Sequence, residues 1–235
     1  MLTSMYRVHA DDRLGFPAPD QAGPEGLLAI GGDLSPARLL AAYAQGIFPW
    51  YNAGQPILWW SPDPRMVLFP AELRVRRSLD KRIRNAGFEV TLDRAFAEVV
   101  IGCAAPRGGE AGTWITDEMY QAYCALHALG YAHSTECWLH GELVGGLYGV
   151  ALGRAFFGES MFSQVPDASK VALVRLVWHL TARDYRFVDC QVRTTHLASL
   201  GARDVPRSEF LRRLEEALTQ PTERGPWRLS ESIGE

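Results

Sequence analysis

The chain has 235 residues, of which 47% are hydrophobic and 22% are charged, and its formal net charge is −3. These values are close to the averages of folded globular proteins, so they exclude a disordered chain and a membrane-spanning class. No stretch approaches the roughly 18 consecutive apolar residues of a transmembrane helix, and the opening segment MLTSMYRVHADDRLGF carries two aspartates where a signal peptide needs an apolar core. We therefore expect a cytoplasmic protein that contacts no membrane.

The net charge and the cysteines exclude further classes. A net negative chain has no overall attraction to nucleic acid, so any contact with RNA requires a local cluster of basic residues. The four cysteines form no C-x-x-C pair, which argues against a zinc site and against a disulfide framework. We expect no metal ion.

The N-terminal quarter of the chain is rich in Pro, Gly and Trp and predicts one clear helix. In the segment LSPARLLAAYAQG, Ser35 can cap the helix N-terminus and Gly46 can end the helix. We expect the rest of this part to be turn-rich. Closely spaced prolines in WWSPDPRMVLFP favour a domain boundary near Pro64, because each proline excludes helix and removes a hydrogen-bond donor. The sequence therefore predicts a small N-terminal domain over residues 1–64 and a larger domain over residues 65–235.

Strand and helix signals alternate in the larger domain. MVLF and FEVTL are typical of strands, a helix begins at Asp93, and a second helix begins at Thr116. Three extended segments separated by turns then predict an antiparallel meander, over residues 131–139, 142–152 and 154–162. Residues 171–180 show helical spacing, YRFVDCQV is typical of a strand, and a short helix begins near Thr195. The tail after Thr219 is polar, and we expect loose packing there.

This order of elements resembles the GNAT acyltransferase fold. That fold is an α+β class with a central mixed, mostly antiparallel sheet. Since one fold hosts many functions, the function has to be argued from the residues of the site.

Two polar side chains in the last long strand emerge on the same face. Because side chains alternate along a strand, Asp189 and Gln191 point one way while the residues between and beside them point the other. A carboxylate beside a carboxamide on an otherwise apolar strand is either satisfied internally or faces a cleft. The pattern leaves open a structural hydrogen-bonded pair and a functional site.

Two tryptophans lie in turn-like, polar contexts instead of on a periodic apolar stripe. Trp50 in FPWY and Trp114 in GTWIT therefore favour a position on the surface or in a cleft. An isolated tryptophan is more often part of a core, so both interpretations stay open.

The segment RVRRSLDKRIR carries six cations and one acid. If it is helical, an apolar face lies opposite a basic stripe that consists of Arg74, Arg77, Lys81 and Arg84. Such a stripe either binds phosphates or is simply solvated.

Seven segments together resemble the leucyl/phenylalanyl-tRNA–protein transferases, and they occur in the order typical of that family. They span about residues 24 to 210 and are GLLAIGGDLSPARLLAAYAQGIFPWY, ILWWSPDPR, GTWIT, HSTECW, LVGGLYGVALGRAFFGESMFS, ASK, and VDCQV followed by THLASLGA. The resemblance implies a small N-terminal domain beside a GNAT-type domain, with the reactive ester held between them. It also implies transfer of Leu or Phe, with Met as a candidate third donor, from aminoacyl-tRNA to the N-terminal Arg or Lys of acceptor proteins, which marks them for degradation.

The resemblance assigns catalytic roles to Asp189, Gln191 and Glu159. Gln191 can orient the attacking amine or donate to the developing oxyanion, and Asp189 can polarise Gln191 or stabilise the incoming ammonium. Glu159, in GESMF, is a natural partner for the acceptor's cation or α-amine, although an exposed strand glutamate is the alternative. No cofactor is expected, because the ester is already activated and part of the α-amine is neutral at pH 7.

The resemblance also implies sites for the donor amino acid and for the tRNA. The apolar pocket is expected to contain Leu147, Phe156 and Met161. Including Phe156 requires a β-bulge, because strict alternation puts Phe156 and Met161 on different faces of the strand. Trp50 and Trp114 would stack on the 3′-terminal adenosine, and the basic stripe would contact tRNA phosphates. We expect the protein to act as a monomer.

Two other functions fit parts of the sequence. An acyl-CoA-dependent N-acyltransferase of the same fold usually has a Gly-rich pyrophosphate loop before the helix that follows the meander, but here that position reads SQVPDASK. A non-catalytic tRNA-binding module would use the basic stripe and the tryptophans, yet it would leave Asp189, Glu159 and Gln191 without a role.

We predict that neutralising Arg77 and Lys81 flattens the salt dependence of tRNA binding. A basic stripe contacts phosphates and not bases, so each lost contact removes about one counterion from the slope of log affinity against log salt. Filter binding across a salt series measures this slope, and an unchanged slope would contradict the prediction.

Overall fold

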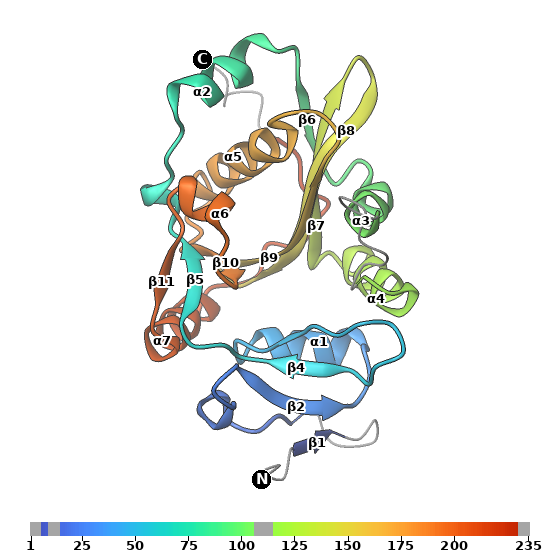
Figure 1. The fold of residues 1–235 in the computed structure, drawn as a ribbon, viewed down its shortest axis with the longest axis vertical. Coiled ribbons are helices and arrows are strands. Elements are labelled where there is room, and N and C mark those ends of the chain that lie inside the picture. The colour runs from blue at the N-terminus through green and yellow to red at the C-terminus, as the bar shows by residue number, and fades with distance from the viewer. Residues whose placement is uncertain (1–5, 9–14, 106–114, 230–235) are drawn as a thin grey trace.

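Two β-sheets organise the chain (Figure 1), and the computed structural model describes residues 6–8, 15–105 and 115–229. The first sheet has four strands, in the spatial order β1 (Tyr6–Val8), β2 (Leu27–Gly31), β4 (Leu58–Trp60) and β3 (Phe48–Pro49). The second has seven, in the order β11 (Arg203–Val205), β5 (Arg65–Leu68), β10 (Phe187–Gln191), β9 (Ala155–Ser163), β8 (Glu142–Leu152), β7 (Ala132–Leu139) and β6 (Glu89–Leu92). In the second sheet β9 and β10 are parallel and the other neighbouring pairs are antiparallel.

The helices are α1 (Pro36–Tyr43), α2 (Arg77–Asn85), α3 (Phe96–Ala104), α4 (Asp117–Ala128), α5 (Ala168–Thr181), α6 (Thr195–Ser199) and α7 (Arg207–Leu218), with short 3-10 helices at Pro19–Gln21 and Pro70–Glu72. The chain is therefore an α+β protein with a small N-terminal part and a central mixed, mostly antiparallel sheet, as predicted. Among the helices of the described residues, none is both long and apolar enough to cross a membrane.

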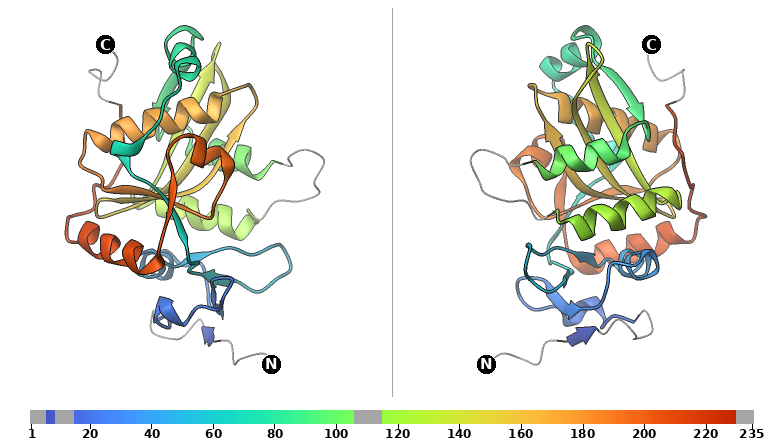
Figure 2. Two further views of the ribbon diagram at one scale, coloured as in Figure 1. Left: turned by 60° about the vertical axis from the view of Figure 1, so that its left-hand side comes forward. Right: turned by 90° about the vertical axis from the view of Figure 1, so that its right-hand side faces the viewer.

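Helices cover both faces of the seven-stranded sheet (Figures 1 and 2). On one face lies α5, whose Val174 and Val177 share a buried cluster with Leu147 of β8. On the other face lie α3 and α4, whose buried side chains share a second cluster with α1 and α7, including Tyr43 and Phe210. The second cluster is continuous with the N-terminal sheet, so the small N-terminal part packs directly against the larger sheet.

Capping and periodicity predicted several elements correctly. The side chain of Ser35 accepts a hydrogen bond from the Arg38 N–H at 3.4 Å, and that of Thr116 accepts one from the Met119 N–H at 3.3 Å. These are the expected N-caps of α1 and α4. The predicted meander is confirmed as β7, β8 and β9.

Outside α1 most of the described residues of the N-terminal part lie in turns and loops, as expected, but the sequence did not predict the sheet that forms between them. This part forms the four-stranded sheet, whose strands contain only two to five residues. Strands this short offer too few positions for alternation to be visible in the sequence.

Asp93 does not begin a helix, because α3 starts three residues later at Phe96. Its backbone is left-handed, with φ of 55°, and its carboxylate accepts hydrogen bonds from the backbone N–H groups of Ser134 at 2.9 Å and Trp227 at 2.6 Å. Backbone donors that are distant in the sequence therefore occupy the carboxylate that the local signal predicts as a helix cap.

The basic stripe is only partly helical. Helix α2 begins at Arg77, whereas Arg74 precedes it and donates its backbone N–H to the carbonyl of Leu200 at 2.8 Å. Arg74 is therefore not on a shared helical face with Arg77, Lys81 and Arg84, which corrects the prediction. The alignment fails because this backbone hydrogen bond holds the segment before α2 against another part of the chain.

Most of the C-terminal tail is exposed or partly exposed, but the expectation of loose packing after Thr219 was wrong at Trp227. Trp227 is 3% exposed and stacks on His133 with ring centroids 3.6 Å apart. Its indole N–H donates to the carbonyl of Glu223 at 3.1 Å. One large apolar side chain thus anchors an otherwise polar segment.

Replacing Trp227 with alanine is expected to lower the free energy of unfolding by about 3–5 kcal/mol, the usual cost of deleting a buried aromatic side chain. Urea denaturation measures the change. The control is Ile101→Ala at a position 58% exposed, which should change stability by less than about 0.5 kcal/mol. Equal effects of the two substitutions would mean that the tail contributes nothing to stability.

Candidate active site

A pocket of about 660 Å³ opens where β9 and β10 separate. The two strands pair in parallel up to Phe157 and Asp189. Beyond this point residues of both strands line the pocket, and α5, α6 and the end of α3 complete its walls. The opening in the sheet is therefore the element that creates the cavity.

A bulge in β9 decides which side chains reach the apolar part of the pocket. The register between β8 and β9 shifts at Tyr148, which leaves Glu159 as the extra residue between its neighbours. The β-bulge expected in this strand is thereby confirmed. It brings Leu147, Phe156 and Met161 together along the pocket, where they pack with the cluster on the α5 face.

Asp189 is completely buried and forms a two-pronged ion pair with Arg65. Arg65 Nε donates to Oδ1 at 2.8 Å and Nη2 donates to Oδ2 at 2.7 Å. Oδ1 also accepts the backbone N–H of Gln191 at 2.9 Å. In this structure the carboxylate therefore has no exposed surface, and its charge is matched by Arg65.

Gln191 follows a second bulge and has a left-handed backbone. The register of β10 against β5 shifts between Asp189 and Gln191, so Cys190 is the extra residue, and φ at Gln191 is 61°. The Gln191 side-chain Nε2 donates to Glu159 Oε1 at 2.9 Å. Asp189 and Gln191 both line the pocket, as the sequence analysis expected of a functional pair, but the bulge at Cys190 interrupts the strict alternation on which that expectation was based. Asp189 has no exposed surface, whereas Gln191 is 9% exposed.

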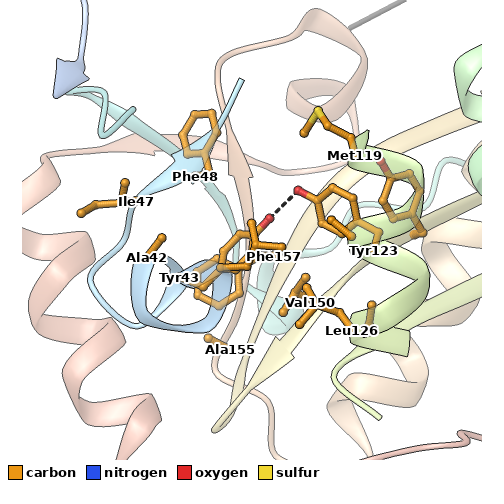
Figure 3. Packing of buried hydrophobic residues seen from close by; sticks show 14 of the residues in the cluster. Ala42, Tyr43, Ile47, Phe48, Met119, Tyr123, Leu126, Val150, Ala155 and Phe157 are labelled. Carbon is orange, nitrogen blue, oxygen red and sulfur yellow. Dashed lines mark hydrogen bonds between the residues drawn. The ribbon is translucent and has the colours of Figure 1, made fainter. Parts of the chain in front are cut away.

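Glu159 links the pocket to two tyrosines. Its Oε2 accepts the hydroxyl of Tyr123 at 2.6 Å, and the Tyr123 hydroxyl lies 2.7 Å from that of Tyr43. Figure 3 shows Tyr43 of α1 and Tyr123 of α4 pointing toward each other. Burial of the Glu159 carboxylate raises its pKa to about 7, although the hydrogen bond from Tyr123 acts in the opposite direction. The carboxyl group therefore changes its charge close to neutral pH.

The residues expected to contact tRNA lie elsewhere. Trp50 is 43% exposed, as predicted, but it does not line the pocket and packs against Trp60 with ring centroids 5.8 Å apart. Trp114 lies outside the described residues. The neighbouring Tyr51 places its hydroxyl 3.5 Å from that of Thr116, so the loop with Trp50 meets the start of α4.

The cations of the basic run have different surroundings. Arg77 and Lys81 are exposed on α2. Arg84 forms an ion pair with Asp80 on the same helix. Within the described ranges, no group of three His, Cys, Asp or Glu side chains is arranged to hold a metal ion.

Sequence reasoning missed Arg65, Tyr43 and Tyr123. A lone arginine at the start of the apolar strand MVLF was a usable signal, because a charge in a buried strand requires a partner. The two tyrosines gave no such signal, since a phenol on an apolar helix face usually belongs to the core.

The structure is an α+β fold with a mixed, mostly antiparallel sheet and a pocket where two parallel strands separate. The family described as leucyl/phenylalanyl-tRNA protein transferase matches residues 67–215, and its N-terminal domain matches residues 32–63. The chain belongs to this family.

Similar proteins named leucyl/phenylalanyl-tRNA–protein transferase occur in several bacteria. That of Nitrosospira multiformis is 62% identical over 86% of this chain and 87% of its own length. That of Anaeromyxobacter sp. (strain Fw109-5) is 60% identical over 96% of both chains. A solved GCN5-related N-acetyltransferase from Kribbella flavida is 12% identical, covers 70% of this chain and 58% of its own, and has a TM-score of 0.28, a likeness too weak to support an assignment.

The raised pKa of Glu159 predicts a pH-dependent contribution to stability. Between about pH 4.5 and pH 7 the folded protein keeps a proton on Glu159, whereas the unfolded chain, in which the pKa is near 4.5, has released it. This contribution is therefore complete below about pH 4.5 and is lost as the pH rises through about 7. Glu159→Gln cannot titrate, so its stability relative to wild type should increase between about pH 5 and pH 8. Urea denaturation at both pH values checks this, and a constant difference would contradict it.

Proposed function

We propose that this protein transfers a leucyl or phenylalanyl group from an aminoacyl-tRNA to the N-terminal α-amine of an acceptor protein. The amine attacks the ester carbonyl carbon, a C–N bond forms, and the C–O bond to the ribose breaks. The ribose hydroxyl leaves with one proton, so the reaction needs no cofactor. The observation that carries this proposal is the Gln191 carboxamide, held by Glu159 beside an apolar pocket in a chain of this family.

The apolar part of the pocket suits the donor side chain. Leu147, Phe156 and Met161 offer aliphatic and aromatic surface without a charge. One methylene more or less in such a pocket changes binding by about 1–3 kcal/mol. A preference for Leu and Phe over smaller residues is therefore expected to be graded, and Met is a candidate third donor.

Gln191 is proposed to orient the attacking amine. Its Nε2 is held by Glu159, and among the described residues none donates to its Oε1, so this oxygen can accept an N–H of the amine. A carboxamide is not a base, but an α-amine with a pKa of about 7.7–8.0 is partly neutral already at pH 7. Positioning of amine and ester can remove about 7 kcal/mol of the barrier, more than proton transfer usually contributes.

Glu159 is proposed to favour acceptors that begin with Arg or Lys. Its carboxylate, partly buried at the pocket, can pair with the acceptor's cation or its α-ammonium. Addition of Leu or Phe would then mark these proteins for degradation. We further propose that the enzyme works as a monomer in the cytoplasm, where aminoacyl-tRNA is available.

The tRNA is proposed to bind through the tryptophans and the basic run. Trp50 and Trp114 would stack on the 3′-terminal adenosine, while Arg77 and Lys81 would contact phosphates, with Arg74 and Arg84 as flanking cations. The exposure of Trp50 and of the two cations supports these roles.

The domain boundary near Pro64 is also proposed. It would give an N-terminal domain over residues 1–64 and a transfer domain over residues 65–235. Its support is that the last strand of the first sheet ends at Trp60 and the first strand of the second begins at Arg65.

One assay tests the activity against its alternatives. Leucyl-tRNA labelled in the amino acid is incubated with a peptide that begins with Arg, and mass spectrometry looks for a peptide extended by Leu. The same peptide acetylated at its N-terminus is the control, and acetyl-CoA replaces the tRNA in a parallel reaction. Acetylation would support an acyl-CoA enzyme, and tRNA binding without either product would support a binding module.

Gln191→Ala is expected to lower turnover by about 10- to 100-fold while changing the Kd for leucyl-tRNA by less than about threefold, because positioning acts mainly in the transition state. Filter binding and single-turnover kinetics give the two quantities. The matched control is Gln45→Ala, whose side chain does not line the pocket and donates to the Ala41 carbonyl in α1 at 2.9 Å. Equal losses in turnover and affinity would contradict the positioning role.

A further inference from the structure

We propose that Arg65, which lies behind the pocket wall, is a positioning residue for the transfer reaction. Through Asp189 it fixes the backbone of Gln191, so that the carboxamide of Gln191 faces the substrate. This inference rests on the proposed function.

Arg65 is fully buried, and its surroundings hold the guanidinium in one orientation. Besides the two hydrogen bonds to Asp189, Nη1 donates to the carbonyl of Gly46 at 3.1 Å. The rings of Phe48 and Phe210 have their centroids 4.8 Å and 4.6 Å from the guanidinium carbon. Contacts therefore converge on one side chain from the N-terminal part, from α7 and from β10.

Asp189 depends on this cation. A carboxylate with no exposed surface remains ionised only if a partner compensates its charge, and Arg65 is that partner. The ionised Asp189 in turn accepts the Gln191 N–H. Loss of Arg65 would therefore weaken the acceptor that holds the Gln191 backbone.

Gln191 needs such an acceptor because its conformation is unfavourable. A left-handed φ of 61° is rare for a residue with a side chain and persists only when neighbouring contacts hold it. That conformation sets the direction in which the carboxamide leaves the strand toward Glu159 and the pocket. The chain of contacts thus runs from Arg65 to the atoms proposed to meet the amine.

A lysine at position 65 keeps the charge but not the geometry. Its single ammonium cannot reproduce the planar fork that serves both oxygens of Asp189 and the Gly46 carbonyl together. Arg65→Lys therefore tests the arrangement rather than the charge.

The experiment compares Arg65→Lys with Arg38→Lys in the full-length protein. Arg38 is equally buried and forms an ion pair with Asp33 in the N-terminal part, away from the pocket. With leucyl-tRNA and an Arg-initiated peptide, Arg65→Lys should lower kcat by about 10- to 100-fold and change the KM for leucyl-tRNA by less than about threefold. Arg38→Lys should keep kcat within about threefold of wild type. A preserved kcat in Arg65→Lys, or the same loss in both variants, overturns the proposal.

A double variant tests whether Arg65 acts through Asp189. In single-turnover reactions with excess enzyme, adding Arg65→Lys to Asp189→Asn should lower the rate by less than about a further threefold. The reason is that the effects of two substitutions in one chain of contacts are not additive. If Arg65→Lys lowered the rate of the Asp189→Asn variant as much as it lowers that of the wild type, Arg65 would act by another route, and the proposal would be overturned.

A structural readout separates this inference from the activity itself. In ¹⁵N-labelled protein the side-chain amide signal of Gln191, assigned through Gln191→Ala, should shift or broaden in Arg65→Lys and stay unchanged in Arg38→Lys. If the wild type makes no Leu-extended peptide, the proposed function fails, yet this signal still tests the positioning role. An unmoved signal in Arg65→Lys overturns it.

Discussion

The buried ion pair between Arg65 and Asp189 is the interaction on which the site depends. Two charges removed from water are tolerated only with close, well-directed hydrogen bonds, and this pair has two of them, at 2.7 and 2.8 Å. The third nitrogen of the Arg65 guanidinium donates to the Gly46 carbonyl, and Asp189 Oδ1 also accepts the backbone N–H of Gln191. Removing either charge would leave the other uncompensated. The end of β10 at Gln191 is therefore held by this ion pair as well as by packing.

Two bulges turn a continuous sheet into a site with a polar and an apolar half. The extra residue at Glu159 moves a carboxyl group to the edge of the pocket, and the extra residue at Cys190 lets the backbone reverse into the left-handed conformation of Gln191. The same shift in β9 lets Phe156 and Met161 share one face. Because a bulge re-aims the side chains that follow it, these two shifts bring polar groups next to the apolar part of the pocket.

The small N-terminal part contributes directly to the polar half. The hydroxyl of Tyr43 in α1 meets that of Tyr123, which in turn donates to Glu159, and the carbonyl of Gly46 receives Arg65. The contacts of Tyr43 with Tyr123 and of Arg65 with Gly46 are buried, and that of Tyr123 with Glu159 is partly buried; in such surroundings hydrogen bonds are strong and unpaired groups are costly. Withdrawal of the Glu159 carboxyl group from water raises its pKa. The hydrogen bonds from its partners favour the charged form and offset only part of that rise.

Local signals in the sequence determined the class of fold and part of the site. Caps, the 3.6-residue period and the meander turns depend on neighbours in the chain, so α1, α4 and the three central strands were predictable. The sequence also singled out Asp189 and Gln191, which both line the pocket, although the extra residue Cys190 interrupts the regular alternation between them. Only the tertiary structure decided that Arg65 pairs with Asp189 across 124 positions, that Trp227 anchors the tail, and that the short N-terminal strands form a sheet. Burial and partner choice depend on contacts between distant segments, and no periodic pattern along the chain encodes them.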